Sequence, residues 1–173
     1  MNLDKITSGK NPPTEINVII EVSQGSSVKC EIDKNSGALT VDRFLYTSLT
    51  FPFNYGLIPH TVSDDGDPLD VVLISSLPVV CGAVVPSRPI GILEMEDEAG
   101  LDDKIIALPL RDIDPLFAKI KDIAEIDNHS KERMKHFFER YKELEPGKWV
   151  KVERFLSKKA AEKKIKDSLV GRK

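Results

Sequence analysis

Short stretches rich in β-branched residues, separated by turn-forming residues, fill the first two-thirds of the chain and constrain its fold most strongly. They span residues 16–22, 28–32, 39–44, 71–75, 89–96 and 104–108. Such stretches are typical of β-strands, and a series of short strands favours a barrel. The polar, glycine-containing segments 34–37 and 98–101 have the composition of hairpin turns. We therefore expect a barrel with a hairpin at each of these segments.

The apolar spacing changes after Asp112 from a period of two to about 3.6, which predicts helices. The first is expected to begin at Asp114 and Pro115 as cap and first-turn proline. The second is expected to be capped by Ser130 and to end near residues 146–147. A last strand at 149–155 precedes a helix that starts at Ser157. The apolar faces of the three helices are Leu116, Phe117, Ile120 and Ile123; Met134, Phe137, Phe138 and Tyr141; and Ala161, Ile165 and Leu169.

Length and composition favour one globular domain spanning residues 1–173, because 40% of the residues are hydrophobic and 31% are charged. The net charge of −3 provides no field that would gather nucleic acid. The longest apolar stretch, 71–85, is interrupted by polar residues and is shorter than the roughly 20 residues that cross a bilayer. We expect no nucleic-acid partner and no membrane span.

Cysteine and histidine usage is sparse. Cys30 and Cys81 are far apart in the sequence and form no Cys-x-x-Cys pair, which favours buried, inert thiols in a reducing compartment. The first ten residues lack the continuous apolar stretch of a secretory signal, so a cytoplasmic location is expected. The three histidines match no zinc-site spacing, so no zinc site is expected.

Two acidic groups stand out. Asp65, Asp67 and Asp70 lie within six residues, and Asp97, Asp102 and Asp103 flank the turn at Gly100. Carboxylates are hard ligands that suit Mg²⁺, Mn²⁺ or Ca²⁺, and paired divalent ions activate water in phosphoryl hydrolysis. The alternatives are an acidic surface turn and a solvated hairpin tip. An EF-hand loop is excluded, because its glycine and glutamate positions hold Asp70 and Ser76.

Several basic and aromatic residues have two interpretations each. Lys29 and Glu31 share the charged face of a strand. Arg43 is either a surface arginine or a fork for phosphate, and Tyr141 lies on an apolar helix face, as a core aromatic would. Tyr55, Lys104 and Lys142, taken singly, indicate structure or surface as readily as function.

The chain as a whole closely resembles the soluble inorganic pyrophosphatases of the bacterial type, from about residue 16 to residue 155. The resemblance rests on 31–34 (Glu-Ile-Asp-Lys), 37–39 (Gly-Ala-Leu), 42–43 (Asp-Arg), 54–56 (Asn-Tyr-Gly), 66–71 (Gly-Asp-Pro-Leu-Asp-Val), 97–100 (Asp-Glu-Ala-Gly) and 147–151 (Gly-Lys-Trp-Val-Lys). It implies an α+β, mainly β fold, with a five-stranded OB-like barrel and flanking helices. It also implies Mg²⁺-dependent hydrolysis of pyrophosphate to two phosphates, several Mg²⁺ ions per site, and a homohexamer.

The resemblance also implies roles for single residues. Asp67 matches the general base that deprotonates the attacking water. Asp65, Asp70 and Asp102 match ligands of the activating metals, Asp97 and Glu21 match ligands of metals that arrive with substrate, and Glu31 matches a further acidic member of the metal site. The phosphate-binding groups are matched by Lys29, Arg43, Tyr55, Lys104, Tyr141 and Lys142. Phe51 departs from the tyrosine common in the family, which we interpret as a peripheral change.

Three other classes of function fit the sequence less well. A nucleic-acid-binding OB module is encouraged by the barrel and by the lysines at 158, 159, 163, 164 and 166, but the chain lacks aromatics interleaved with basic residues. That lysine run is interpreted as the solvated face of a helix. A nucleotide hydrolase is disfavoured, since neither a P-loop nor a Gly-x-Gly-x-x-Gly turn is present. A purely structural protein leaves the gathered acids unexplained.

Overall fold

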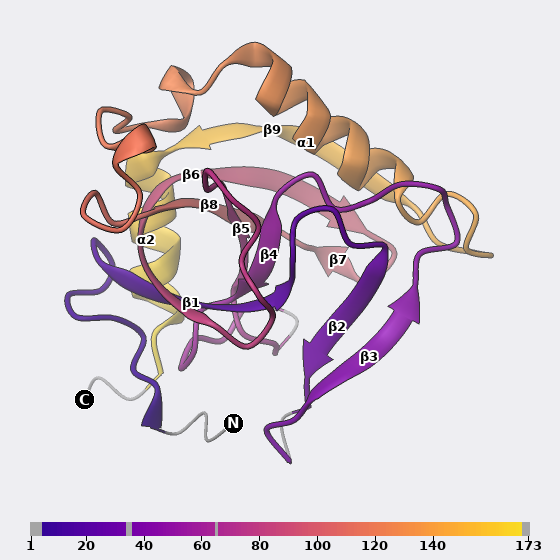
Figure 1. The fold of residues 1–173 in the computed structure, drawn as a ribbon. Coiled ribbons are helices and arrows are strands. Elements are labelled where there is room, and N and C mark those ends of the chain that lie inside the picture. Colours follow the sequence, from indigo (N-terminus) through magenta and orange to yellow (C-terminus); the bar gives the residue numbers. More distant parts are fainter. Residues whose placement is uncertain (1–4, 34–35, 65, 171–173) are drawn as a thin grey trace.

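The structure is a computed structural model that describes residues 5–33, 36–64 and 66–170 (Figure 1). Its strands are β1 Ile16–Val22, β2 Val28–Ile32, β3 Leu39–Phe44, β4 Asn54–Leu57, β5 Asp70–Leu73, β6 Val84–Asp97, β7 Gly100–Leu101, β8 Lys104–Pro109 and β9 Val150–Ser157. Its helices are α1 Asn128–Arg140 and α2 Lys158–Ser168, with 3₁₀ turns η2 Pro115–Phe117 and η3 Ile123–Glu125.

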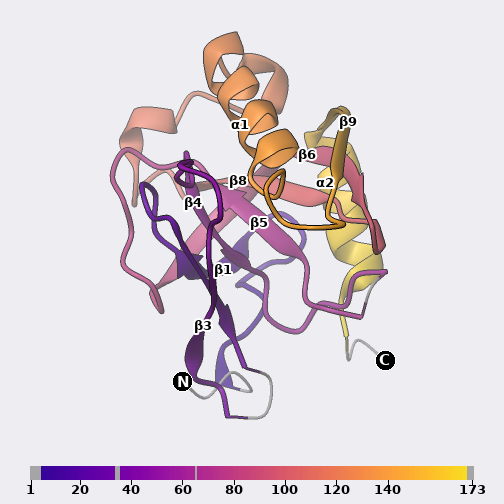
Figure 2. The same ribbon diagram turned by 90° about the vertical axis from the view of Figure 1, so that its right-hand side faces the viewer.

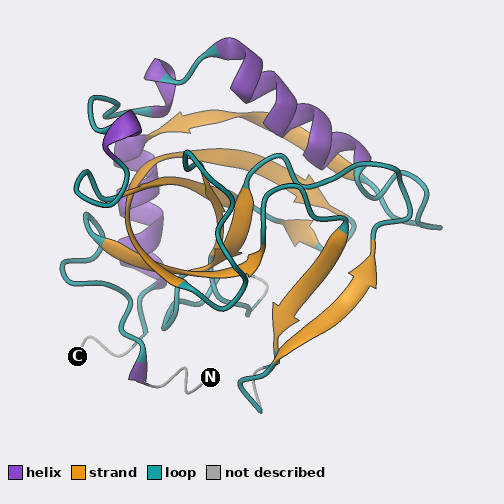
Figure 3. Ribbon diagram, viewed as in Figure 1, coloured by secondary structure: helices purple, strands orange, loops and turns teal. Residues whose placement is uncertain are grey.

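Five strands close into a ring. The pairing order is β1-β4-β5-β8-β6, and β6 returns to β1 through the pairs from Ile16↔Ser87 to Ile19↔Val84. All of these pairs are antiparallel except β5–β8. The long β6 extends beyond the ring, where it also pairs with β7 and β9 (Figure 3). The ring confirms the expected five-stranded barrel.

The β2–β3 hairpin forms a separate two-stranded sheet that projects from the barrel (Figures 1 and 2). Its pairs run from Val28↔Phe44 to Ile32↔Leu39, so the expected hairpin is present, although Lys34 and Asn35 of its turn lie outside the described residues. The second expected hairpin is also present, because β6 and β7 pair antiparallel around a turn in which Gly100 has a φ of 124°.

The segment after Asp114 differs from the expected helix. Asp114 does cap, accepting from the Leu116 N–H, but a 3₁₀ turn of three residues follows. The guanidinium of Arg88 donates to the carbonyls of Phe117 and Ile120, both at 2.7 Å. These two carbonyls thus have a side-chain donor, and the segment continues as a second 3₁₀ turn, η3, rather than as the expected helix.

The remaining boundaries also shift. The cap of α1 is Asp127 rather than Ser130, and α1 ends at Arg140 rather than near residue 146. The final helix occurs as expected, with Ala161 and Ile165 fully buried. Strands β4 and β7 were not anticipated, and β5, β6, β8 and β9 begin or end one to five residues from the expected bounds. Across the described part of the chain, no helix is both long and apolar enough to cross a membrane.

The core consists of two main groups of buried side chains. One joins the aromatic face of α1 to the barrel, and the other joins α2 to residues of β1, β5 and β8. The cysteines contribute to neither group, because Cys30 is half-buried and Cys81 is exposed, both as free thiols. The expectation of two buried thiols is therefore wrong, because Cys81 is exposed and Cys30 is only half-buried.

Gly56 of β4 lies opposite Ile20 of β1 and leaves no room for a side chain. A Cβ at this position would lie 1.9 Å from the Ile19 carbonyl oxygen, which is backbone and cannot rotate away. We expect Gly56→Ala to lower the free energy of unfolding by about 3 kcal/mol, at the upper end for overpacking. Urea denaturation measures this. Lys166→Ala, at an exposed position of α2, serves as the control and should change the free energy of unfolding by no more than about 0.5 kcal/mol. Equal effects of the two substitutions would contradict the close packing.

Candidate active site

The two strands that run parallel bring Asp70 and Lys104 together. Because β5 and β8 pair in the register Val71↔Ile105, both strands begin at the same end of the barrel. Asp70 is the first residue of β5 and Lys104 the first of β8, and the Lys104 Nζ donates to the Asp70 Oδ2 at 2.6 Å. The same ammonium also donates to Asp102. Although burial lowers the pKa of Lys104, these two carboxylates raise it above its ordinary value.

The end of β6 reaches the same end of the barrel, because β6 runs antiparallel to β8. Its last residue, Asp97, accepts from the Lys142 Nζ at 2.6 Å and from the Ala99 N–H at 2.8 Å. Burial raises the pKa of Asp97, but these hydrogen bonds outweigh it and leave the pKa below its ordinary value. By contrast, burial dominates at Asp102 and raises its pKa despite the opposing charge of Lys104.

Two buried tyrosines line this region. Burial raises the pKa of both hydroxyls, and the negative charge of Asp70 raises that of Tyr55 further. The Tyr141 ring stacks on Phe137 with centroids 5.2 Å apart, while its hydroxyl interacts with the charges of Lys104 and Arg43. Tyr141 is thus both a core aromatic and a neighbour of the charged groups, so its two interpretations are compatible.

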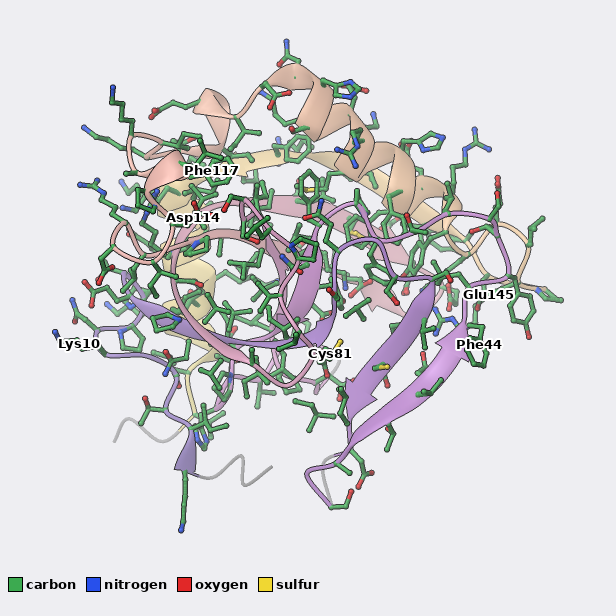
Figure 4. The ribbon with its side chains drawn as sticks, in the orientation of Figure 1. Lys10, Phe44, Cys81, Asp114, Phe117 and Glu145 are labelled. Atoms are coloured by element: carbon green, nitrogen blue, oxygen red, sulfur yellow. The ribbon has the colours of Figure 1, made fainter. Side chains whose placement is uncertain are left out.

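The hairpin contributes a second pair of cations. Lys29 and Arg43 are cross-strand neighbours, and Asp42 accepts from both, at 3.1 Å and 2.6 Å. Lys29 also pairs with Glu31. The Arg43 Nε donates to the Glu145 Oε1 at 3.0 Å, which ties the hairpin to the segment after α1; Figure 4 labels Glu145 and, at the end of β3, Phe44. Burial lowers the pKa of Arg43, but Glu145 and Asp42 raise it overall.

Glu21 is the most deeply buried carboxylate of the region, with 4% of the residue exposed. It lies at an irregularity in the β1–β4 pairing and accepts from the Ile32 N–H at 2.8 Å. Burial raises its pKa to about 7, and the nearby charges of Asp70 and Glu31 act in the same direction. Glu21 therefore lies within electrostatic range of both the barrel carboxylates and the hairpin.

Most of the residues chosen from the sequence meet at this end of the barrel. Those linked by hydrogen bonds or electrostatic interaction are Glu21, Lys29, Glu31, Arg43, Tyr55, Asp70, Asp97, Asp102, Lys104, Tyr141 and Lys142. Asp67 is exposed in the loop before β5, where its carbonyl accepts from the Ser63 N–H at 2.7 Å. Asp65 lies outside the described residues. Asp103 points elsewhere and binds Lys164 of α2.

Sequence reasoning missed Asp42 and Glu145 as members of the charged network. Asp42 lies in the motif at 42–43 that supports the family resemblance, but the resemblance assigned no role to Asp42 itself. Glu145 follows Tyr141 and Lys142 closely in the sequence, which was the one available signal. Phe51 is also closer to the site than expected: it is buried, and its ring lies 5.5 Å from that of Tyr55, so the change is not peripheral.

The donor chemistry suits a hard divalent cation, since carboxylate oxygens gather here and Asp70 and Asp102 already converge on one positive charge. Within residues 5–33, 36–64 and 66–170, no three His, Cys, Asp or Glu side chains are gathered closely enough to hold a metal ion. The ammonium of Lys104 lies between the carboxylates that would share one. Asp70 and Asp102 are a described pair that could share such an ion in its place, and the basic groups around them fit a polyanion.

Known proteins resemble the chain in both sequence and fold. Residues 18–171 match the family model described as inorganic pyrophosphatase. The chain is 52% identical to the inorganic pyrophosphatase of Aquifex pyrophilus over 98% of this chain and 96% of the relative, and 48% identical to that of Gluconobacter oxydans over the full length of both. The solved inorganic pyrophosphatase of Thermus thermophilus matches with a TM-score of 0.93 and 39% identity over 98% and 97% of the two chains. That of Helicobacter pylori matches with a TM-score of 0.89 and 47% identity over 90% and 92%.

The raised pKa of Glu21 predicts a pH dependence of stability in metal-free protein. The folded state keeps the proton to about pH 7, whereas the unfolded chain releases it near 4.5, so the stability that the neutral acid contributes is complete below 4.5 and is lost as pH rises to about 7. Glu21→Gln keeps the hydrogen-bond acceptor without the charge. Above pH 7 we expect it to raise the free energy of unfolding by about 2–3 kcal/mol.

Urea denaturation with a chelator present, over a series of pH values, measures this difference between Glu21→Gln and the unmodified protein. The two curves should meet below the ordinary glutamate pKa. A difference that stayed constant across the series would show that Glu21 is not titrating as its burial requires.

Proposed function

Because the chain belongs to the inorganic pyrophosphatase family, we propose that it hydrolyses inorganic pyrophosphate to two phosphates at the charged end of its barrel. Enzymes of this family are metal-dependent hydrolases, and the metal proposed here is Mg²⁺, with several ions per site. The proposed location of the active site rests on one observation, the pairing of buried Lys104 and Lys142 with Asp70, Asp102 and Asp97. Such pairs place cations for phosphate and carboxylates for metal within one small region.

Substrate binding is proposed to exchange these ion pairs. Pyrophosphate is a polyanion that competes with the carboxylates for Lys29, Arg43, Lys104 and Lys142, and the hydroxyls of Tyr55 and Tyr141 add hydrogen bonds to its oxygens. The displaced carboxylates Asp70, Asp97, Asp102 and Glu31, together with Glu21 and Asp65, would then be available to hold Mg²⁺. When bound, the divalent ions screen the charge of the substrate and make water more acidic.

Asp67 is proposed as the general base. Its place in an exposed loop immediately before Asp70 leaves it accessible to water while Asp70 is held within the site. A carboxylate at this position would accept a proton from the attacking water, while the lysines and Arg43 stabilise the charge that develops on the leaving phosphate.

The rest of the proposal concerns the whole protein. We expect one pyrophosphatase domain over residues 1–173, a cytoplasmic location that suits two free thiols, and a homohexamer. The apolar face of α1 is not available for contacts between subunits, because Met134, Phe137, Phe138 and Tyr141 are buried within the chain. Apolar side chains on the surface support the proposed assembly better. They include Phe44, Leu77 and Val80, which are 68%, 71% and 74% exposed.

A Mg²⁺ titration of initial rates separates the proposed base from the proposed ligands. Asp70→Asn removes a charged oxygen from the metal site, so its activity should fall and recover in part at high Mg²⁺. Asp67→Asn removes the proton acceptor, so its rate should fall about 10² to 10⁴-fold without recovery. The unmodified enzyme is expected to release no phosphate in excess chelator. Recovery of Asp67→Asn at high Mg²⁺ would show that Asp67 is another ligand.

Analytical ultracentrifugation tests the assembly. At micromolar concentration the protein should sediment as a hexamer of the 19.3 kDa chain. Replacement of Leu77 and Val80 together by serine should shift the distribution to smaller species if these side chains lie between subunits. A monomer under the same conditions would reject the proposed hexamer.

A further inference from the structure

Lys164 of α2 is not part of a solvated lysine face. Its side chain is 21% exposed, and its Nζ donates to the Asp103 Oδ2 at 2.8 Å and to the Asp64 Oδ2 at 3.2 Å. Burial lowers the pKa of Lys164, but the two aspartates raise it overall. Asp103 is the firmer partner, since its side chain is 11% exposed while that of Asp64 is 66% exposed.

The two partners belong to different segments of the proposed site. Asp64 begins the loop that carries Asp67 and leads into Asp70, and this loop is closed by the hydrogen bond from the Ser63 N–H to the Asp67 carbonyl. Asp103 lies between Asp102 and Lys104 and also accepts weakly from the Met95 N–H. One ammonium therefore joins the loop before β5 to the residues before β8.

Helix α2 is a fixed support for this ammonium. Ala161 and Ile165 are fully buried in the core group that includes Leu69, Val71 and Ile105. The end of the helix is bound to the chain just before the acidic loop, through Val62 N–H to the Ser168 carbonyl at 2.8 Å and Val170 N–H to the His60 carbonyl at 3.0 Å. The Lys164 side chain thus extends from a part of the molecule that cannot easily move relative to the barrel.

We propose that Lys164 is a positioning residue that holds the Asp67–Asp70 loop against the segment of Asp102, and thereby increases the affinity of the site for a divalent cation. It touches neither the proposed ligands nor the substrate. This inference rests on the proposed function, because it assigns Asp70 and Asp102 to one metal site.

The direction in which the affinity for a divalent cation changes, when Lys164 is replaced, distinguishes a positioning role from a purely electrostatic one. If Lys164 acted only as a nearby positive charge, its removal would strengthen binding of a divalent cation, by about twofold or less for a screened charge. If it positions the two segments, its removal frees them and weakens binding. For a partly buried ion pair of this kind, we expect the affinity for the cation to fall about 3- to 10-fold.

The experiment is isothermal titration calorimetry of Mg²⁺ alone into metal-free Lys164→Met, with Lys163→Met as matched control. Lys163 is an exposed neighbour on the same helix, so the control removes the same charge without an ion pair to these loops. We expect Lys164→Met to bind Mg²⁺ about 3- to 10-fold more weakly, Lys163→Met to bind as the unmodified protein does, and Lys164→Arg to restore most of the affinity. Initial rates should show a higher Mg²⁺ requirement for Lys164→Met with unchanged kcat at saturation.

Tighter or unchanged Mg²⁺ binding by Lys164→Met, with a normal thermal unfolding transition, would overturn the positioning role. So would a loss of kcat that saturating Mg²⁺ does not restore. Failure of the proposed function itself is distinguishable, because the unmodified protein would then release no phosphate from pyrophosphate at any Mg²⁺ concentration. If Lys164→Met did not fold, the calorimetric comparison would be made with Lys164→Gln and Lys163→Gln.

Discussion

The buried ammonium of Lys104 is the constraint on which the charged end of the barrel depends. Only 3% of the Lys104 side chain is exposed, and a charged amine at that depth is stable only beside carboxylates. Asp70 satisfies it because β5 and β8 are parallel, and Asp102 because it lies two residues earlier in the chain. The parallel pairing of β5 with β8 therefore brings these charges together, and without that pairing the Lys104 ammonium would lack Asp70 as a partner.

The same balance of opposite charge extends outward from Lys104. Lys142 is matched by Asp97, and Arg43 by Glu145 and Asp42. Buried ion pairs contribute little net stability compared with apolar packing, so a barrel end built from them is poorly explained by folding alone. An anionic substrate that arrives with divalent cations can exchange with every one of these pairs, which makes the arrangement suitable for pyrophosphate.

Rigid elements surround the charged groups on two sides. On one side, Phe51 and Phe137 pack around Tyr55 and Tyr141, with ring centroids 4.7 to 5.5 Å apart, so that core packing also orients the two hydroxyls. On the other side, α2 contacts both acidic segments through Lys164. The hairpin is linked to the rest of the site by the Arg43–Glu145 ion pair and by the hydrogen bond from the Ile32 N–H to Glu21.

The sequence by itself determined four of the five barrel strands, the β2–β3 hairpin, the apolar face of α2 and the family, because these follow from local periodicity, turn chemistry and ordered motifs. It did not reveal β4, whose Asn54-Tyr55-Gly56 lacks a β-branched pattern, nor the break of the helix expected after Asp114. Only the tertiary structure decided these features, together with the roles of Glu145 and Lys164. Arg43 and Glu145 are 102 residues apart, and Asp103 and Lys164 are 61 apart. A side chain whose partner lies that far along the chain carries no local signal, since its role depends on how the whole chain folds.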